Sequence, residues 1–151
     1  MALAAALRAI ATTMRGAADP WWIIGSAAVR LHGVDTDVAD VDLLTSERDA
    51  RRFCAGHGRQ PIAPAASERF RSAVFGRFED GAMPIEVMGA LTVHGPNGWQ
   101  PVRLRSRQPV PVADTRVFVP DRAELVEVLR LFGRSKDLHR ATLLERRMAA
   151  P

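Results

Sequence analysis

Three acidic residues in apolar surroundings have the types and spacing that fit metal-dependent chemistry. Asp40 and Asp42 alternate with apolar residues within the segment 38–45, and Glu86 has a β-branched residue on each side. Because side chains alternate along a strand, Asp40 and Asp42 are predicted to project from one face while their apolar neighbours enter the core. Carboxylates held close together repel each other, and a divalent cation relieves that repulsion by using them as ligands. The pattern predicts a metal site.

The same residues also have an ordinary structural interpretation. Acids that alternate with apolar residues are typical of a solvated strand face, and a lone strand glutamate such as Glu86 is often simply exposed. The metal hypothesis therefore requires the strand of Glu86 to pair beside the strand of Asp40 and Asp42. Only then do the three side chains point to one position.

A second motif is Gly25-Ser26, which ends a short apolar run and precedes a predicted helix. Glycine lets the backbone approach a ligand closely, and free amides at a helix N-terminus favour phosphate. Ser26 adds a hydroxyl donor, although many such segments are only turns. The chain has no Gly-x-Ser-x-Gly elbow, Walker P-loop or Gly-x-Gly-x-x-Gly motif, which argues against the classes that use them.

Hydrophobic periodicity and turn residues predict the elements that position these motifs. Strands 70–78 and 83–88 are expected to form a hairpin, 59–67 a loop, and short β segments within 91–119 an extension of the same sheet. Asp121 and Ser135 are expected to cap the last two helices, and Gly133 to end the first of these. The predicted helices are 2–15, 27–32, 46–55, 121–132 and 135–148, and the other predicted strands are 21–24 and 38–45.

Composition favours one globular domain over residues 1–151. Its length is typical of a domain, and hydrophobic residues make up 47% and charged residues 25%. Cys54 is the single cysteine, which fits a reducing cytoplasm and excludes an internal disulfide or a cysteine-based zinc site. No run of 18 apolar residues predicts a membrane span, and Arg8 interrupts the one N-terminal run that could act as a secretory signal.

The chain is basic, with a formal charge of +4 and a pI of about 10.8. Such a charge can attract nucleic acid. The arginines are spread along the chain, however, and no predicted helix has a clustered basic face. Nucleic-acid binding is therefore the least favoured interpretation. Lys136 is the single lysine among 21 basic residues, which indicates a need for a compact ammonium at that position, or chance.

The order of the motifs resembles the DNA polymerase beta-like nucleotidyltransferase superfamily, in particular the minimal and abortive-infection (AbiEii-like) bacterial members. The shared pattern is Gly-Ser, about a dozen residues, Asp-x-Asp among apolar residues, and a later strand acid. The segment Gly133-Arg-Ser-Lys-Asp-Leu138 resembles the Gly-Arg-x-Lys-Asp-Leu segment that these proteins often carry between two helices. The matching segments extend from about Trp21 to Leu144. One departure is Val38-Ala39, where many members have a serine, threonine or basic residue.

The resemblance implies an α+β (α/β) nucleotidyltransferase fold, with a mixed sheet, helices mainly on one face and a C-terminal helix pair. It divides the chain into an N-terminal helix 2–15, a catalytic core 21–119 and C-terminal helices 121–149. It also implies that Asp40 and Asp42 hold two Mg²⁺ or Mn²⁺ ions and that Glu86 shares one and activates the acceptor. The nucleotide-binding residues that it implies are Gly25, Ser26, Lys136, Arg71 and Arg77, the last two being surface ion-pair residues in the alternative.

The implied reaction moves a nucleoside monophosphate from a nucleoside triphosphate, such as ATP, to a hydroxyl. The acceptor is a protein, a tRNA or another RNA, or a small molecule, and the implied setting is toxin–antitoxin function or phage defence. The short chain has no recognisable second substrate domain. The alternative from a different class is an inactive module that keeps the fold and binds a nucleotide or a partner protein.

Overall fold

A computed structural model describes residues 2–62 and 67–149 of the chain. The predicted loop 59–67 is therefore described only at 59–62 and 67, and residues 63–66 lie outside. No helix in the described part combines the length and apolar character needed to cross a membrane.

The helices are α1 (Ala2–Thr13), α2 (Gly25–Leu31), α3 (Glu47–Gly56), α4 (Arg122–Phe132) and α5 (Ser135–Ala149). The strands are β1 (Trp22–Ile24), β2 (Val41–Thr45), β3 (Phe70–Arg71), β4 (Val74–Phe78), β5 (Ile85–Gly89), β6 (Thr92–Gly95), β7 (Gly98–Pro101), β8 (Gln108–Val112) and β9 (Thr115–Val119).

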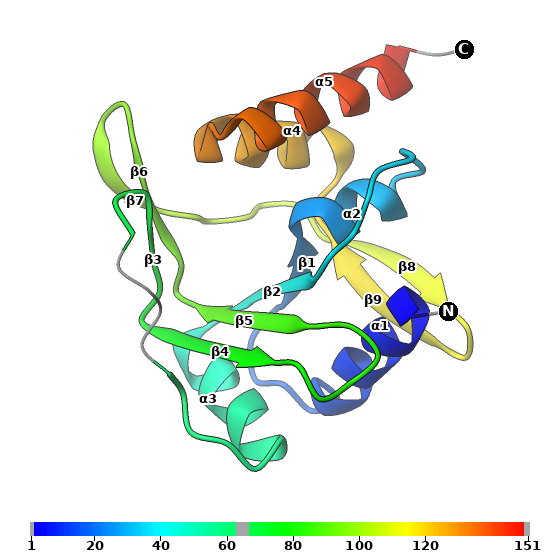
Figure 1. Ribbon diagram of the computed structural model, residues 1–151, viewed down its shortest axis with the longest axis vertical. Coiled ribbons are helices and arrows are strands. Elements are labelled where there is room, and N and C mark those ends of the chain that lie inside the picture. The colour runs from blue at the N-terminus through cyan, green and yellow to red at the C-terminus, as the bar shows by residue number, and fades with distance from the viewer. Residues whose placement is uncertain (1, 63–66, 150–151) are drawn as a thin grey trace.

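The main sheet is mixed and has the strand order β1-β2-β5-β4 (Figure 1). β1 runs antiparallel to β2, β2 runs parallel to β5, and β4 pairs with β5 in the predicted antiparallel hairpin. The central pair matters most for the site, because parallel pairing places Asp42 directly opposite Glu86. The fold class expected from the sequence is confirmed, including the C-terminal helix pair α4–α5.

The prediction that the segment 91–119 extends this sheet is wrong. Its strands β6 and β7 form a sheet with β3 of the preceding segment, and β8 and β9 form a separate hairpin, which lies beside α1 (Figure 1). The predicted strand 70–78 is likewise two strands, since Phe70 pairs with Val93 of β6 whereas Phe78 pairs with Ile85 of β5. A continuous run of phenylalanine and valine favours extended backbone, but tertiary packing selects the partner strand.

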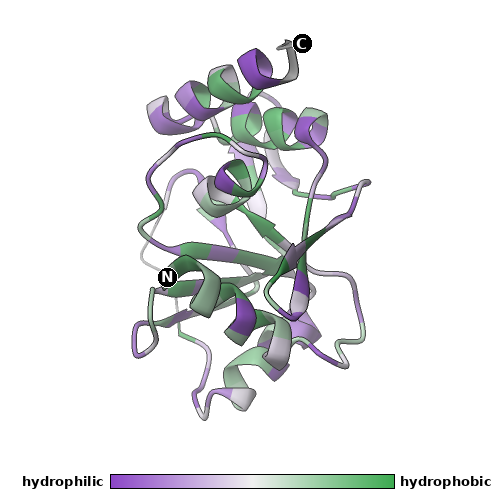
Figure 2. Cartoon of the chain, turned by 90° about the vertical axis from the view of Figure 1, so that its right-hand side faces the viewer, coloured by the Kyte–Doolittle hydropathy of each residue, from purple (hydrophilic) through white to green (hydrophobic). Residues whose placement is uncertain are grey.

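Both faces of the main sheet are covered, but by cores of different size. On one face Val41, Leu43 and Val87 join the larger core with side chains of α1 and α3. On the other face Ile24 and Leu44 belong to a smaller cluster with residues of β6 and α4. In Figure 2 the strands of this sheet are mostly green, that is hydrophobic, whereas α5 carries much purple. The acids of the candidate site lie on the face with the smaller cluster.

Local side-chain chemistry sets the helix ends. Asp121 caps α4 by accepting a hydrogen bond from the Glu124 amide, and Gly133 ends this helix in the left-handed conformation at φ 72°, both as predicted. The predicted cap at Ser135 is wrong by one residue, because α5 begins at Ser135 itself. The carboxylate of Asp137 instead accepts a hydrogen bond from the Arg134 amide.

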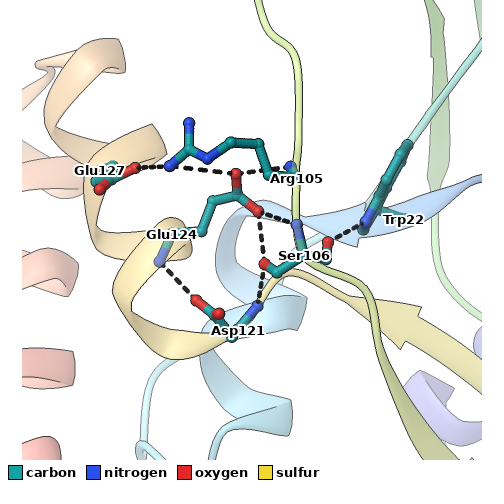
Figure 3. Close-up of polar contacts among 6 residues, drawn as sticks. All are labelled: Trp22, Arg105, Ser106, Asp121, Glu124 and Glu127. Atoms are coloured by element: carbon teal, nitrogen blue, oxygen red, sulfur yellow. Dashed lines mark hydrogen bonds and ion pairs between the residues drawn. The ribbon is translucent and has the colours of Figure 1, made fainter.

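A buried carboxylate joins α4 to β1 (Figure 3). Glu124 accepts hydrogen bonds from the backbone amides of Arg105 and Ser106, each at 2.8 Å, and from the Ser106 hydroxyl. The indole Nε1 of Trp22 donates to the Ser106 carbonyl at 2.8 Å. Burial alone raises the pKa of Glu124, but the hydrogen bonds from Ser106 and Arg105 outweigh it and lower the pKa. The network fixes the segment 102–107 between α4 and the first strand of the sheet.

Candidate active site

The three predicted acids converge on one side of the main sheet. Asp42 and Glu86 are directly opposed on β2 and β5, and Asp40 stands just before β2. One carboxylate oxygen of each lies within 4.8 Å of the others. The side chains of Asp40 and Glu86 are 32% and 26% exposed, so solvent and ligands reach them. The geometry that the metal hypothesis requires is present, and the role of each residue stays a prediction.

The Gly25-Ser26 turn lies against this cluster. β1 and β2 place Ile24 opposite Asp42, so the next residue, Gly25, meets the Asp42 side chain. Gly25 has φ +67°, and a Cβ built there would lie 2.5 Å from Asp42 Oδ2. Only glycine therefore provides both the backbone conformation and the space. Ser26 follows Gly25 in the first turn of α2 and is buried.

Arg77 reaches the cluster from the neighbouring strand β4, where it pairs in register with Glu86. Its Nη1 lies 3.2 Å from Glu86 Oε2 and 3.5 Å from Asp40 Oδ2, and its Nε donates to Glu79 at 2.7 Å. The hydrogen bond with Glu79 is the main reason that the pKa of Arg77 is raised. These contacts are the ion pairs of the alternative interpretation, and phosphate binding by Arg77 stays a prediction.

The electrostatics of Asp42 show how crowded the cluster is. The pKa of Asp42 is raised to about 7, mainly by burial and further by the negative charges of Asp40 and Glu86. The positive charges of Arg134 and Lys136, around the start of α5, oppose this rise in the pKa of Asp42. A group of carboxylate oxygens with this unfavourable self-repulsion fits a hard divalent cation such as Mg²⁺.

Arg134 stands close to the acids but was not among the predicted site residues. Its guanidinium pairs with Asp137 at 2.6 and 3.1 Å and lies 4.9 Å from the centre of the Phe70 ring. The signal was available, because Arg134 belongs to the Gly-Arg-x-Lys-Asp-Leu segment that carries the family resemblance. Lys136, the predicted phosphate ligand from the same segment, is exposed.

A pocket of about 200 Å³ opens beside the acids, with Asp42 and Glu86 in its wall. Arg71 and Arg134 also line it, and the Arg71 guanidinium stacks 3.9 Å from the centre of the Trp99 ring. Most of the remaining wall is apolar, from Ile24, Phe70, Phe75, Met88, Leu91 and Phe132. Sequence reasoning did not identify these apolar residues as pocket residues. One signal was available, because alternation along the strand puts Met88 on the same face as Glu86.

No family model matches the sequence, and no curated protein matches it. Solved structures do match. A Thermotoga maritima protein assigned to the nucleotidyltransferases is 23% identical with a TM-score of 0.70, and the match covers 95% of this chain and 90% of that one. The antibiotic-resistance factor ANT(2″)-Ia is 13% identical with a TM-score of 0.60, over 94% of this chain and 82% of that one.

A third similar structure is an antigenic nucleotidyltransferase-like protein from Paracoccidioides brasiliensis. It is 16% identical with a TM-score of 0.53, and the match covers 99% of this chain and 77% of that one. All three likenesses extend over nearly the whole of this chain. Together with the mixed sheet and the C-terminal helix pair, they show that the chain has the nucleotidyltransferase fold.

Proposed function

We propose that this protein is a metal-dependent nucleotidyltransferase that moves a nucleoside monophosphate from a nucleoside triphosphate to a hydroxyl. The observation that carries the proposal is the convergence of Asp40, Asp42 and Glu86 beside the Gly25 turn, on a nucleotidyltransferase fold. Each residue alone has a plain structural explanation. A solvated strand face does not explain three carboxylates that share one position.

The donor set fits Mg²⁺ or Mn²⁺. Asp40, Asp42 and Glu86 offer only carboxylate oxygens, which these cations prefer, and their mutual repulsion favours a bound cation. Bound there, divalent ions would offset the triphosphate charge and make the acceptor hydroxyl more acidic.

The residues around the acids have distinct proposed roles. Gly25 brings backbone close to the triphosphate, Ser26 donates its hydroxyl to it, and Lys136 supplies a point charge. Glu86 orients the acceptor hydroxyl and takes its proton. The acceptor oxygen forms a bond to the α-phosphorus, the bond from that phosphorus to the oxygen bridging to the β-phosphate breaks, and pyrophosphate leaves.

Binding and transfer test the proposal separately. In calorimetry, the wild type is expected to bind the non-hydrolysable ATP analogue ApCpp only with Mn²⁺ or Mg²⁺, and Asp42→Asn is expected to lose this binding. Asp37→Asn is the matched control, because Asp37 is exposed and stands outside the cluster. With α-labelled ATP and a cell extract, label is expected in a protein, RNA or small-molecule fraction. Equal labelling by the wild type and Asp42→Ala would contradict the catalytic role.

One observation favours a second candidate, an inactive module that binds a nucleotide or a partner protein. Arg77 already places a positive charge against Asp40 and Glu86, and Val38-Ala39 replaces a polar contact common in the resembled superfamily. This candidate predicts no Mn²⁺ binding and no metal-dependent stabilisation in a thermal shift assay.

The acceptor and setting remain parts of the same proposal. The AbiEii-like resemblance supports a toxin–antitoxin or phage-defence role in the cytoplasm, which would use a protein or RNA as the acceptor, whereas the pocket beside the acids favours a small molecule. The fractionated labelling experiment separates these acceptors from small molecules.

A further inference from the structure

The pocket beside the acids has room for a small ring. Its volume is about 200 Å³. An apolar protein cavity of about 150 Å³ holds one benzene molecule. The pocket therefore accommodates a single substituted ring.

The walls of the pocket have the chemistry of a ring-binding site. Phe70 and Phe132 meet edge to face with ring centres 5.1 Å apart, and Phe75 and Met88 line the same pocket. Phenylalanine side chains bind rings by offset or edge contacts, and methionine sulfur packs well against aromatic groups. A flat apolar ring gains more here than an extended polar chain.

The pocket wall holds the carboxylates of Asp42 and Glu86 and the guanidinium groups of Arg71 and Arg134. Arg134 is neutralised by Asp137, and Glu86 is paired with Arg77. Arg71 stacks on Trp99 and has no carboxylate within 4.0 Å among residues 2–62 and 67–149. Its guanidinium is therefore available to an anionic group and repels a cationic one.

The residues that line the pocket indicate whether it binds the acceptor or the triphosphate. Glu86, the proposed acceptor-activating residue, lines it, whereas Gly25 and Ser26, the proposed triphosphate-binding residues, do not. We infer that the pocket binds the acceptor and that the acceptor is a small molecule with one hydroxyl-bearing ring and an anionic group. This inference rests on the proposed function, and it assigns Arg71 to acceptor recognition in place of phosphate binding.

Three probes that share a phenol ring test the inference. They are 4-hydroxyphenylacetate (anionic), tyramine (cationic) and N-acetyl-tyrosinamide (neutral, standing for a protein tyrosine). Their binding to the full chain is measured by ligand-detected NMR in the presence of ApCpp, in a buffer that contains Mg²⁺ but no Mn²⁺. The anionic probe is expected to bind about tenfold more tightly than tyramine, the size of a charge-assisted contact.

Two variants locate the probe. Arg71→Glu is expected to reverse the order of the anionic and cationic probes, while Arg15→Glu, which makes the same charge change outside the pocket, leaves it unchanged. Ser72→Trp, which fills the pocket from its wall without removing a core side chain, is expected to abolish binding of all three probes. Circular dichroism of each variant confirms that it is folded.

The outcomes separate this inference from the proposed function. If ApCpp binds with metal but no probe binds in its presence, the acceptor pocket is refuted and the transferase proposal stands. Tightest binding by tyramine or by N-acetyl-tyrosinamide overturns the anionic acceptor. If neither ApCpp nor any probe binds, the proposed function fails and the inference fails with it.

Discussion

The two faces of β2 and β5 carry opposite chemistry on the same stretch of backbone. On one face Val41, Leu43 and Val87 have no exposed surface. On the other face Asp42 and Glu86 oppose each other in register, with Asp40 beside them and Glu86 26% exposed. The alternation of side chains along a strand is enough to place the apolar residues on one face and the acids on the other.

The difference teaches that packing on the apolar face stabilises the sheet, and that the sheet therefore tolerates repulsion between carboxylates on the acidic face. The apolar face gains free energy from burial in the larger core. The acidic face loses free energy, because burial and like charges raise the pKa of Asp42 to about 7. The predictions below test this contrast, from the largest expected effect to the smallest.

Removing packing from the apolar face should have the largest effect. Leu43→Ala leaves a cavity in the larger core and is expected to lower the free energy of unfolding by about 3 kcal/mol. Leu44→Ala removes the same atoms beside the smaller cluster and is expected to cost less. Urea unfolding of both variants measures the difference, and equal losses would contradict the contrast between the two faces.

Removing charge from the acidic face should stabilise the metal-free protein. Asp42→Asn is expected to raise the free energy of unfolding at pH 8 by about 2 kcal/mol, allowing for solvent around a partly exposed group. The pKa of Asp42 is raised from 3.8 to about 7, so its contribution to stability is present below pH 3.8 and lost as pH rises through 7. The gain from Asp42→Asn should therefore grow from about pH 4 to pH 7 and then level off.

Urea unfolding with EDTA at pH 5, 6, 7 and 8 measures that gain, with the exposed Asp37→Asn as the control. A gain that does not change with pH would mean that Asp42 is not the titrating group. Saturating Mn²⁺ should reverse the order, because the wild type keeps the ligand that the variant lacks.

A side chain at Gly25 should disturb both the turn and the acid. Gly25→Ala is expected to cost about 1–2 kcal/mol from the positive φ alone, and its Cβ would also press on Asp42 Oδ2. In an Asp42→Ala background only the backbone cost should remain. A double-mutant cycle by urea unfolding measures this coupling, and a coupling of zero would show that the two residues do not contact each other.

Arg77→Gln should have the smallest effect on stability, about 1 kcal/mol or less, because its ion pairs are partly exposed. Removing this positive charge is expected to tighten Mn²⁺ binding in calorimetry, whereas Arg51→Gln, which breaks an exposed pair with Glu47, should not. Absence of Mn²⁺ binding in every form would favour the inactive module.

Local signals predicted much of this fold and site. The Asp-x-Asp spacing predicted that Asp40 and Asp42 lie together, although Asp40 stands just before β2 and not within it. The cap at Asp121 and the stop at Gly133 marked the limits of α4. Each of these features depends on residues close in sequence. Strand alternation and helix capping therefore predict them directly.

Features that depend on distant partners could not be predicted. The division of the segment 70–78 between two sheets depends on which strand each half meets. Arg77 reaches Glu86 only through the register of β4 with β5. Glu124 looks like a surface residue in its own helix, and only the segment 102–107, which folds over it, makes it a buried acceptor (Figure 3).

The close fit of Gly25 to the Asp42 carboxylate also has an evolutionary consequence. As long as a descendant keeps the aspartate, any larger residue at the turn meets an oxygen 2.5 Å from its Cβ. Once the aspartate is replaced by a small residue, that barrier disappears and only the backbone preference remains. In diverging lineages, substitutions at positions 25 and 42 should accordingly occur together. The replacement of Asp42 should come first and that of Gly25 should follow.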